Sequence, residues 1–290
     1  MTAIGAMLRR DLPPEELIET ARAIAPLLDE LWIVEDLDWP GGVAQLAAVL
    51  EATDDDTSGR PVVGHGVAPA PFRNPAALAM EWASLARMYP ARLHAGIGHG
   101  VPGWMGRIGG SVESPLTLLR ETIESVRAIL RGGEVSYDGR YVHLEAIDLR
   151  FPPEIVPPVL AGVIGPRSLE LSGAVADGTL LCEGHDAGQI AAARGRIAAG
   201  RSEDGAPAEH RFTQYVGYFL GAEDDLPPPP TDGPEGGWAA VSEDADEMAT
   251  LLQGVIDVGV DSLVLVPFGP TIEQLRRFET DVRPRLRLAT

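Results

Sequence analysis

Short apolar segments alternate with longer segments of helical periodicity along almost the whole chain. Segments of four to eight mostly apolar residues are typical of strands buried on both faces of a parallel sheet. Between them, apolar residues recur every three or four positions, as at Leu17, Ala21, Ile24 and Leu28. The pattern predicts about eight strand–helix units, whose strands occupy residues 3–8, 31–34, 61–66, 93–98, 158–163, 179–182, 213–220 and 262–266.

Prolines mark several helix beginnings. Asn74-Pro75, Ser114-Pro115 and Gly165-Pro166 each place a residue that suits the N-cap before a proline at the first helical position. Pro26 instead falls inside the first helical segment. Because an interior proline removes a backbone hydrogen bond, we expect that helix to kink or to end early.

Two stretches depart from the strand–helix alternation. Residues 134–144 alternate around Asp138-Gly139, the strongest short hairpin signal, and predict a β-hairpin inserted before the fifth strand. Residues 222–237 are acidic and rich in proline, and predict a mobile loop. No change of composition divides the chain. We therefore expect one α/β domain over residues 1–290, a (β/α)8 TIM barrel with an inserted hairpin.

The composition excludes several function classes. The chain has 290 residues, of which 43 are acidic and 23 are basic, so its formal net charge is −20. It contains no lysine. Nucleic acid is therefore not an expected partner, and neither a lysine Schiff base nor a Walker-type phosphate loop is available. No apolar run is long enough for a membrane span and no signal peptide is recognisable, so we expect a cytoplasmic protein. Cys182, the single cysteine, is expected to be a core residue rather than a nucleophile.

Residues 157–182 combine a buried strand, a turn, a helix and the next strand. Gly165 stands at the N-cap and Pro166 at the first helical position, so free backbone N–H groups point out of the strand's carboxyl end beside Arg167. Such a turn can bind an anion or serve as a tight connection.

Polar residues at the predicted strand ends fit four classes of function. A metal-dependent hydrolase would use imidazole and carboxylate ligands, although no His-x-His pair is present. A glycosidase would pair Glu35 with a distant carboxylate. A phosphorylated-cofactor enzyme and a non-catalytic binding barrel are the other two. The candidate metal ligands are Glu35, Asp36, His65, His99 and His185.

Glycines stand at the ends of the third and fourth predicted strands. They either let a flat ring approach the backbone closely or form simple turns. These residues are Gly64, Gly66, Gly98 and Gly100.

Three motifs resemble the bacterial luciferase-like family of flavin- and deazaflavin-dependent oxidoreductases, which includes methylenetetrahydromethanopterin reductase-like members. They are ARLHAGIGHGVPGWM (91–105), SPLTLLRETIESVRAILRGGEVSYDGRYVHL (114–144) and VLAGVIGPRSLELSGAVADGTLL (159–181), and the resemblance runs over about residues 4–268. It implies a (β/α)8 barrel that binds FMN or the deazaflavin coenzyme F420 at the carboxyl ends of its strands.

The resemblance also implies roles for individual residues. It assigns the coenzyme phosphate to the backbone of Gly162, Val163, Ile164, Gly165, Pro166 and Arg167, and places Gly98, His99 and Gly100 beside the ring. Several members have a non-proline cis peptide at the end of the third strand, and Gly66-Val67 is the matching pair.

The segment after the second strand departs from the family. Members often have an Asp-His or Glu-His pair there, whereas this chain has Glu35-Asp36. We therefore expect Asp36 to donate the proton, with Glu35 or His65 as alternatives, and two neighbouring carboxylates could keep one of them protonated. Trp104 and Phe268 are the expected apolar walls of the substrate pocket.

The coenzyme stays open between F420 and FMN, with deazaflavin hydride transfer favoured and an oxygen-dependent FMN monooxygenase as the alternative. F420 carries an acidic oligoglutamyl tail, which a protein of charge −20 would repel unless Arg73, Arg107 or Arg167 lies along its path. The expected partner is a small organic substrate that no motif identifies, and a homodimer stays open.

Overall fold

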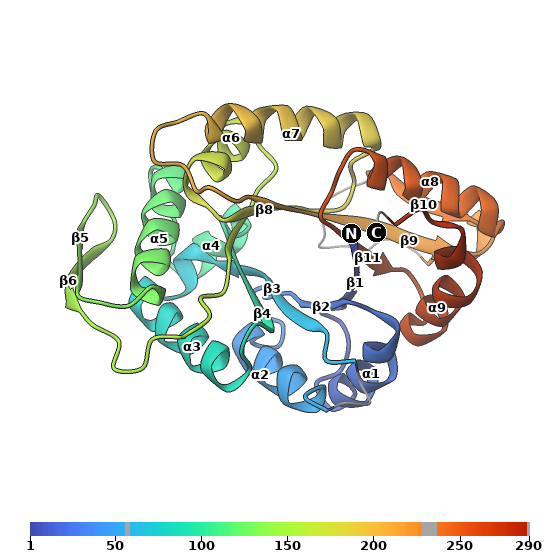
Figure 1. The fold of residues 1–290 in the computed structure, drawn as a ribbon, viewed down its shortest axis with the longest axis horizontal. Helices are drawn as coiled ribbons and strands as arrows, with labels where there is room; N and C mark the ends of the chain where they lie inside the picture. Colours follow the sequence, from blue (N-terminus) through green and yellow to red (C-terminus); the bar gives the residue numbers. More distant parts are fainter. Residues whose placement is uncertain (56–58, 228–236, 289–290) are drawn as a thin grey trace.

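Eight parallel strands form a closed barrel in the computed structural model, which describes residues 1–55, 59–227 and 237–288 (Figure 1). Each strand pairs in parallel with its neighbours, and pairing between the sixth and seventh barrel strands closes the ring. The predicted (β/α)8 barrel is therefore confirmed. The barrel strands are β1 (Ala3–Leu8), β2 (Glu30–Ile33), β3 (Val62–Pro69), β4 (Leu93–Gly98), β7 (Val159–Gly162), β8 (Gly178–Leu181), β9 (Arg211–Leu220) and β11 (Ser262–Pro267).

Helices surround the barrel and cover the outward side of its strands (Figure 1). Asn74 and Ser114 cap their helices as predicted, each accepting a hydrogen bond from a first-turn N–H. The first helix ends at Ile24, and a 3₁₀ turn over Ala25–Leu27 holds Pro26, which confirms the expected early end. The α-helices are α1 (Leu17–Ile24), α2 (Gly42–Ala52), α3 (Pro75–Met88), α4 (Pro102–Arg107), α5 (Pro115–Leu130), α6 (Pro166–Val175), α7 (Ala187–Arg201), α8 (Ala245–Asp257) and α9 (Thr271–Arg277).

The inserted hairpin consists of antiparallel strands β5 (Val135–Asp138) and β6 (His143–Ile147) and lies outside the barrel, as predicted (Figure 1). Glu121 of α5 attaches it to the barrel. Its carboxylate accepts backbone N–H groups of the hairpin turn at 2.7 to 2.9 Å, and these bonds lower the pKa of Glu121 although burial opposes them.

Three features differ from the sequence expectation. A short strand, β10 (Ala239–Ser242), pairs in parallel with the far end of β9, and a short helix, α4 (Pro102–Arg107), which the strand–helix pattern does not include, follows β4. Strand β3 continues to Pro69, three residues beyond its predicted end. The predicted mobile loop lies partly outside the described residues, which lack 228–236.

Polar side chains fill the end of the barrel at which its strands begin, and apolar side chains fill its middle. Glu30, 2% exposed, accepts hydrogen bonds from Trp32 Nε1 at 2.9 Å, from the Ser262 hydroxyl and from Arg211, and His94 lies 4.0 Å away. One carboxylate thus connects β2, β9 and β11, with β4 beside it. Above it lies a cluster of Trp32, Leu160, Leu180, Tyr215, Val264 and Val266, with Met7 and Val67 at its edge.

Replacing Glu30 with alanine should destabilise the barrel strongly. Arg211 would lose its carboxylate in a mostly closed space, and breaking a buried pair in this way costs about 3 kcal/mol or more. Urea unfolding should show this loss in the free energy of unfolding. Glu113→Gln is a suitable control because the Arg140–Glu113 pair is exposed, and it should cost less than about 1 kcal/mol. Equal costs for the two variants would contradict the role given to Glu30.

Stability should also fall as the pH drops from about 6.5 to 4. Burial lowers the pKa of His94 from its ordinary 6.5 to about 4, with Glu30 opposing and Arg211 adding to the shift. Between these values the unfolded chain binds a proton that the folded chain does not. The contribution of His94 to the free energy of unfolding is therefore complete above pH 6.5. Below pH 6.5 it falls by about 1.4 kcal/mol per pH unit. The urea concentration at the midpoint of unfolding, measured across this pH range, should depend less on pH in His94→Gln than in the parent protein.

Candidate active site

The two carboxylates after β2 point to opposite sides of the barrel wall. Side chains alternate along a strand, so residues of even number in β2, such as Glu30 and Trp32, face the lumen. Continuing this alternation, Asp36 turns toward the barrel mouth and Glu35 toward the helices. The expectation that these two carboxylates share a proton is therefore wrong, because they do not face each other.

Glu35 is part of the scaffold. Its carboxylate, 4% exposed, receives two hydrogen bonds from Arg73 at 2.6 Å and the Gly42 N–H at 3.1 Å, at the start of α2. Burial raises the pKa of Glu35, but hydrogen bonds from Arg73 and His65 outweigh it and lower the pKa to about 2. A group that stays ionised at neutral pH does not suit proton donation.

His65 is also enclosed in the wall. Its ring is fully buried, packs edge-on against Trp82 of α3 at 5.8 Å, and has Nε2 3.4 Å from Glu35. It therefore contacts the helical layer and not the lumen, which leaves Asp36 as the one predicted proton donor that faces the mouth.

At the mouth, Asp36 is held by Arg10, which follows β1. Arg10 donates to Asp36 Oδ2 at 2.8 Å, and its guanidinium lies 5.2 Å from the Trp39 ring and 6.0 Å from the Trp104 ring. The aromatic faces attract the cation and limit its movement. Trp104, a predicted pocket wall, thus reaches the same cluster from α4.

Glu183 completes this cluster and was not among the predicted catalytic residues. It follows β8, across the mouth from Asp36. Burial is the largest cause that raises the pKa of Glu183, and the Asp36 charge adds to it, whereas a hydrogen bond from its own backbone N–H and the charges of Arg10 and His185 act in the opposite direction. Its position directly after a barrel strand, like that of Asp36, is the signal that could have identified it.

A bulge in β3 shapes the floor of the mouth. His65 pairs with Ala95 and Ala68 with Ile97, so β3 has one residue more than β4 between these pairs. The Gly66–Val67 peptide bond in this bulge is cis, as expected, but it lies within β3 and not at its end. The strand resumes pairing after the bulge, which explains its extra length.

The glycines of the neighbouring strands make room for Val67. A Cβ at Gly98 would lie 2.6 Å from Val67 Cγ2, and one at Gly162 2.5 Å from Cγ1. The proposed use of Gly98 for direct approach of a coenzyme ring is therefore corrected, because the Val67 side chain fills that space. Gly100 forms a turn at φ 72°, with Met105 of α4 close beside it.

The start of α6 is open. Gly165 is the N-cap, no side chain caps this end, and the first bond into the helix joins Leu169 N–H to Gly165 O at 2.8 Å. The N–H groups of Arg167 and Ser168 precede that bond and so lack an acceptor within the helix. A Cβ at Gly165 would meet nothing closer than Ser168 Oγ at 3.8 Å, and Ile164 is 60% exposed. An anion can reach these groups from solvent.

His99 joins the end of β4 to this helix. Its Nε2 lies 3.0 Å from Ser168 Oγ, and burial lowers the pKa of His99, which favours the neutral ring. His99 and His65 therefore point to different places, and among the described residues no group of three or more His, Cys, Asp or Glu side chains could hold a metal ion. The metal-hydrolase alternative thus lacks a site in residues 1–55, 59–227 and 237–288.

Two further residues border the mouth. Phe268 lies over Gly217 of β9, whose Cβ would be 3.0 Å from the ring, and can form a pocket wall there. Cys182 has its pKa raised to about 12, by burial first and then by Glu183, so its thiol stays protonated and unreactive at neutral pH.

These elements define a parallel α/β barrel with a candidate ligand site at the carboxyl ends of its strands. The sequence model of the luciferase-like monooxygenase family matches residues 1–225, and the chain belongs to this family. None of the helices in the described ranges is long and apolar enough to cross a membrane.

Curated relatives match part of this chain. It is 34% identical over 159 residues to the 5,10-methylenetetrahydromethanopterin reductase of Methanolobus tindarius, covering 54% of this chain and 48% of the relative. It is 30% identical over 185 residues to the F420-dependent glucose-6-phosphate dehydrogenase of Gordonia bronchialis, covering 60% and 54%. The chain thus spans about half the length of these relatives.

Solved structures share the fold over the whole chain. An F420-dependent secondary alcohol dehydrogenase in complex with an F420-acetone adduct has a TM-score of 0.83 at 18% identity, covering 99% of this chain and 100% of the other. The oxygenating constituent of 3,6-diketocamphane monooxygenase of Pseudomonas putida, in complex with FMN, has a TM-score of 0.75 at 14% identity, covering 100% of both chains.

Replacing Gly165 with valine should abolish binding of a phosphorylated coenzyme while the protein stays folded. The added Cβ has room in the protein, but the larger side chain would occupy the approach to the free N–H groups. Fluorescence titration with F420 and with FMN measures the effect. Gly41→Val is the matched control, because Gly41 is also an open N-cap but the adjacent α2 start is occupied by Glu35. Unchanged affinity of Gly165→Val for both coenzymes would move the site elsewhere.

Proposed function

We propose that this protein is an oxidoreductase that binds coenzyme F420 or FMN at the barrel mouth and transfers a hydride to or from a small organic substrate, with F420 favoured. The open start of α6 carries this proposal, because it offers free N–H groups for the phosphate at the mouth of a luciferase-like barrel. The names of the curated relatives, a reductase and an F420-dependent dehydrogenase, favour hydride transfer over oxygenation.

The residues at the mouth fit such a coenzyme. The N–H groups of Arg167 and Ser168 would hold the phosphate, and His99 fixes the Ser168 hydroxyl beside them. Val67 presents an apolar side chain at the lumen edge, on which a flat ring can lie. The bound coenzyme supplies the hydride chemistry, and the protein supplies orientation and a proton.

Asp36 and Glu183 are the two candidates for that proton. Asp36 receives a charge-assisted hydrogen bond from Arg10, which holds its carboxylate in place. Glu183 is instead mostly enclosed and close to the negative charge of Asp36, and both conditions favour its protonated form. We therefore assign the proton to Glu183 and a positioning role to Arg10 and Asp36, in place of the expected donation by Asp36. On reduction of a carbonyl, Glu183 would give its proton to the oxygen as the carbon receives the hydride, and solvent would restore it.

Oxygenation by an FMN enzyme is the alternative. The reason to test this alternative is the similarity of the fold to that of an FMN-bound monooxygenase. Anaerobic assays separate the two functions. Oxidation of reduced F420 by an organic substrate without oxygen, seen as recovery of the absorbance of the oxidised deazaflavin, supports hydride transfer, whereas strict dependence on oxygen would assign the protein to the monooxygenases.

Glu183→Gln should lower turnover by roughly 100-fold with little change in coenzyme affinity, as expected for loss of a general acid. In the carbonyl-reducing direction, the parent rate should be high below the pKa of Glu183 and fall above it, because the acid must be protonated. Anaerobic stopped-flow across pH, with aldehydes and ketones screened first for oxidation of reduced F420 to the coloured oxidised form, measures both effects.

Asp36→Asn distinguishes the two carboxyl groups. If Glu183 is the acid, this variant removes a charge that raises the Glu183 pKa, so the falling limb moves to lower pH. If Asp36 is the acid, the limb disappears in Asp36→Asn and persists in Glu183→Gln, and our assignment is wrong.

A further inference from the structure

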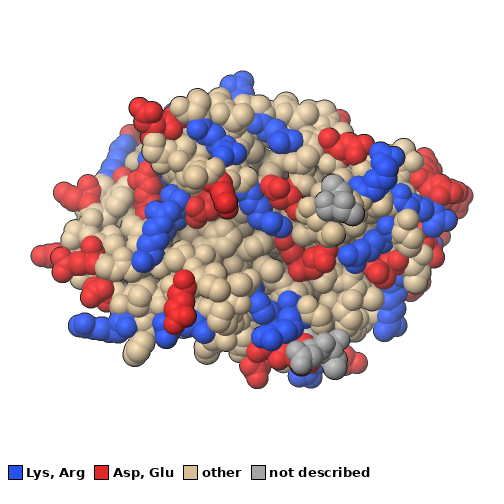
Figure 2. Space-filling view, viewed as in Figure 1, with Lys and Arg blue, Asp and Glu red and all other residues tan. Residues whose placement is uncertain are grey.

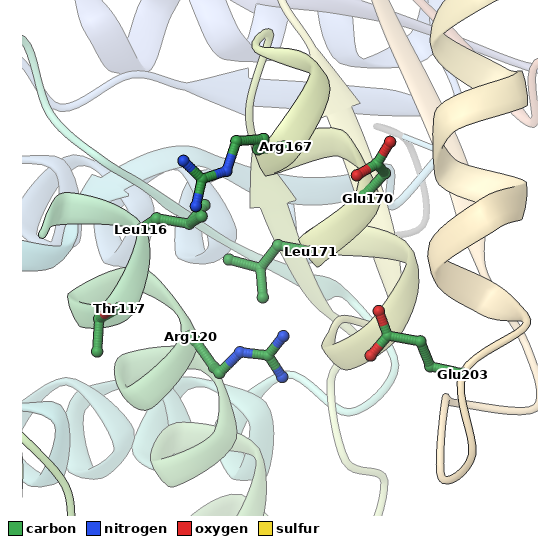
Figure 3. Close-up of a pocket in the computed structure, with 7 residues that line it drawn as sticks. All are labelled: Leu116, Thr117, Arg120, Arg167, Glu170, Leu171 and Glu203. Atoms are coloured by element: carbon green, nitrogen blue, oxygen red, sulfur yellow. The ribbon is translucent and has the colours of Figure 1, made fainter.

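The groove between α5 and α6 begins at the proposed phosphate site and leads away from the mouth. It has a volume of about 210 Å³. Leu116, Thr117 and Arg120 line it from α5, and Arg167, Glu170 and Leu171 from α6 (Figure 3). Arg167 is also in the first turn of α6, so the groove and the free N–H groups share one end.

Arg167 is the cation without a partner in this region. Of the three arginines considered for an acidic tail, Arg73 is bound to Glu35 and Arg107 to Asp38 at 2.6 Å. Arg167 is exposed and makes no hydrogen bond or ion pair with any described residue. Arginines and carboxylates are interspersed on the face shown in Figure 2.

The groove provides both charge and an apolar floor. In Figure 3 the guanidinium groups of Arg167 and Arg120 enter it from the two helices, with Leu116 and Leu171 between them. A rise of 1.5 Å per residue places Arg120 about 6 Å from Leu116 along α5. Arg120 is only partly engaged, by Glu124 at 3.3 Å, and Glu170 is neutralised by Arg196 at 2.8 Å.

We propose that this groove binds the first glutamates of the F420 tail, with Arg167 and Arg120 on their carboxylates and the two leucines under their methylene groups. The inference rests on the proposed function, because FMN has no such tail. It also explains how a chain of charge −20 can accept a polyanionic coenzyme. The side chain of Glu203 also lines the groove and has no partner among the described residues. Its negative charge repels carboxylates farther along the tail, so these add no further affinity.

Titration of the protein with two forms of oxidised F420 tests the inference. One form carries two glutamates, and the other keeps the ring and phosphate but has none. At low salt the tailed form should bind about three- to tenfold more tightly, the effect of two exposed ion pairs, and the difference should shrink as salt is added. Arg167→Gln and Arg120→Gln should each reduce the preference.

Arg276→Gln is the matched control, since Arg276 is an exposed arginine on α9, away from the groove (Figure 1). It should keep the parent preference. Equal affinity of the parent protein for both forms would overturn the tail site but leave the coenzyme proposal standing. An equal loss for both forms in Arg167→Gln would place Arg167 on the phosphate and likewise overturn it. Failure of the protein to bind either form would refute the proposed F420 function itself.

Discussion

The buried carboxylate of Glu30 is the interaction on which the barrel interior depends. It holds groups from β2, β9 and β11 at the lower end of the lumen, where an unpaired charge would be costly. Its hydrogen bond to Trp32 fixes an indole ring that lies 5.7 Å from the Tyr215 ring. The same indole occupies the space in which a side chain at position 64 would lie, so Gly64 cannot be replaced without a collision. A polar contact at one end thus sets the packing in the middle.

That packing continues up to the mouth. The Tyr215 hydroxyl lies against Gly66, so any side chain there would collide with it, and the next residue, Val67, is accommodated by glycines of β4 and β7. The floor of the site is therefore the top of a continuous column of lumen side chains. Barrel interiors are packed in layers, and here the uppermost layer is the surface offered to a ligand.

Much of the fold could be predicted because strand–helix alternation is a local pattern. The spacing of apolar residues predicts the closed barrel, the turn residues predict the hairpin, and a proline predicts the end of the first helix. Strand β10 could not be found this way, since Ala239–Ser242 has no distinctive pattern. It forms because β9 has ten residues and extends beyond its pairing with β8, which leaves backbone groups for another strand to pair with.

The site was predictable in position but less so in roles. The turn before α6 was recognised from Gly165-Pro166, whose meaning is local. Gly98 was placed beside a coenzyme ring, whereas the space that it leaves is filled by Val67, a contact between strands that no sequence pattern reveals. Glu183 and Asp36 lie far apart in the sequence, and only the closed barrel brings their charges together.

The opposite orientations of Glu35 and Asp36 bear on how this protein can change over time. Two adjacent codons thus encode a residue that stabilises the barrel wall, Glu35, and a residue at the mouth, Asp36, to which we assign a part in the proposed chemistry. Glu35 is held by Arg73 and Asp36 by Arg10, so substitutions at the two positions disturb different ion pairs. New substrates can therefore be explored at one position while the other keeps the wall intact.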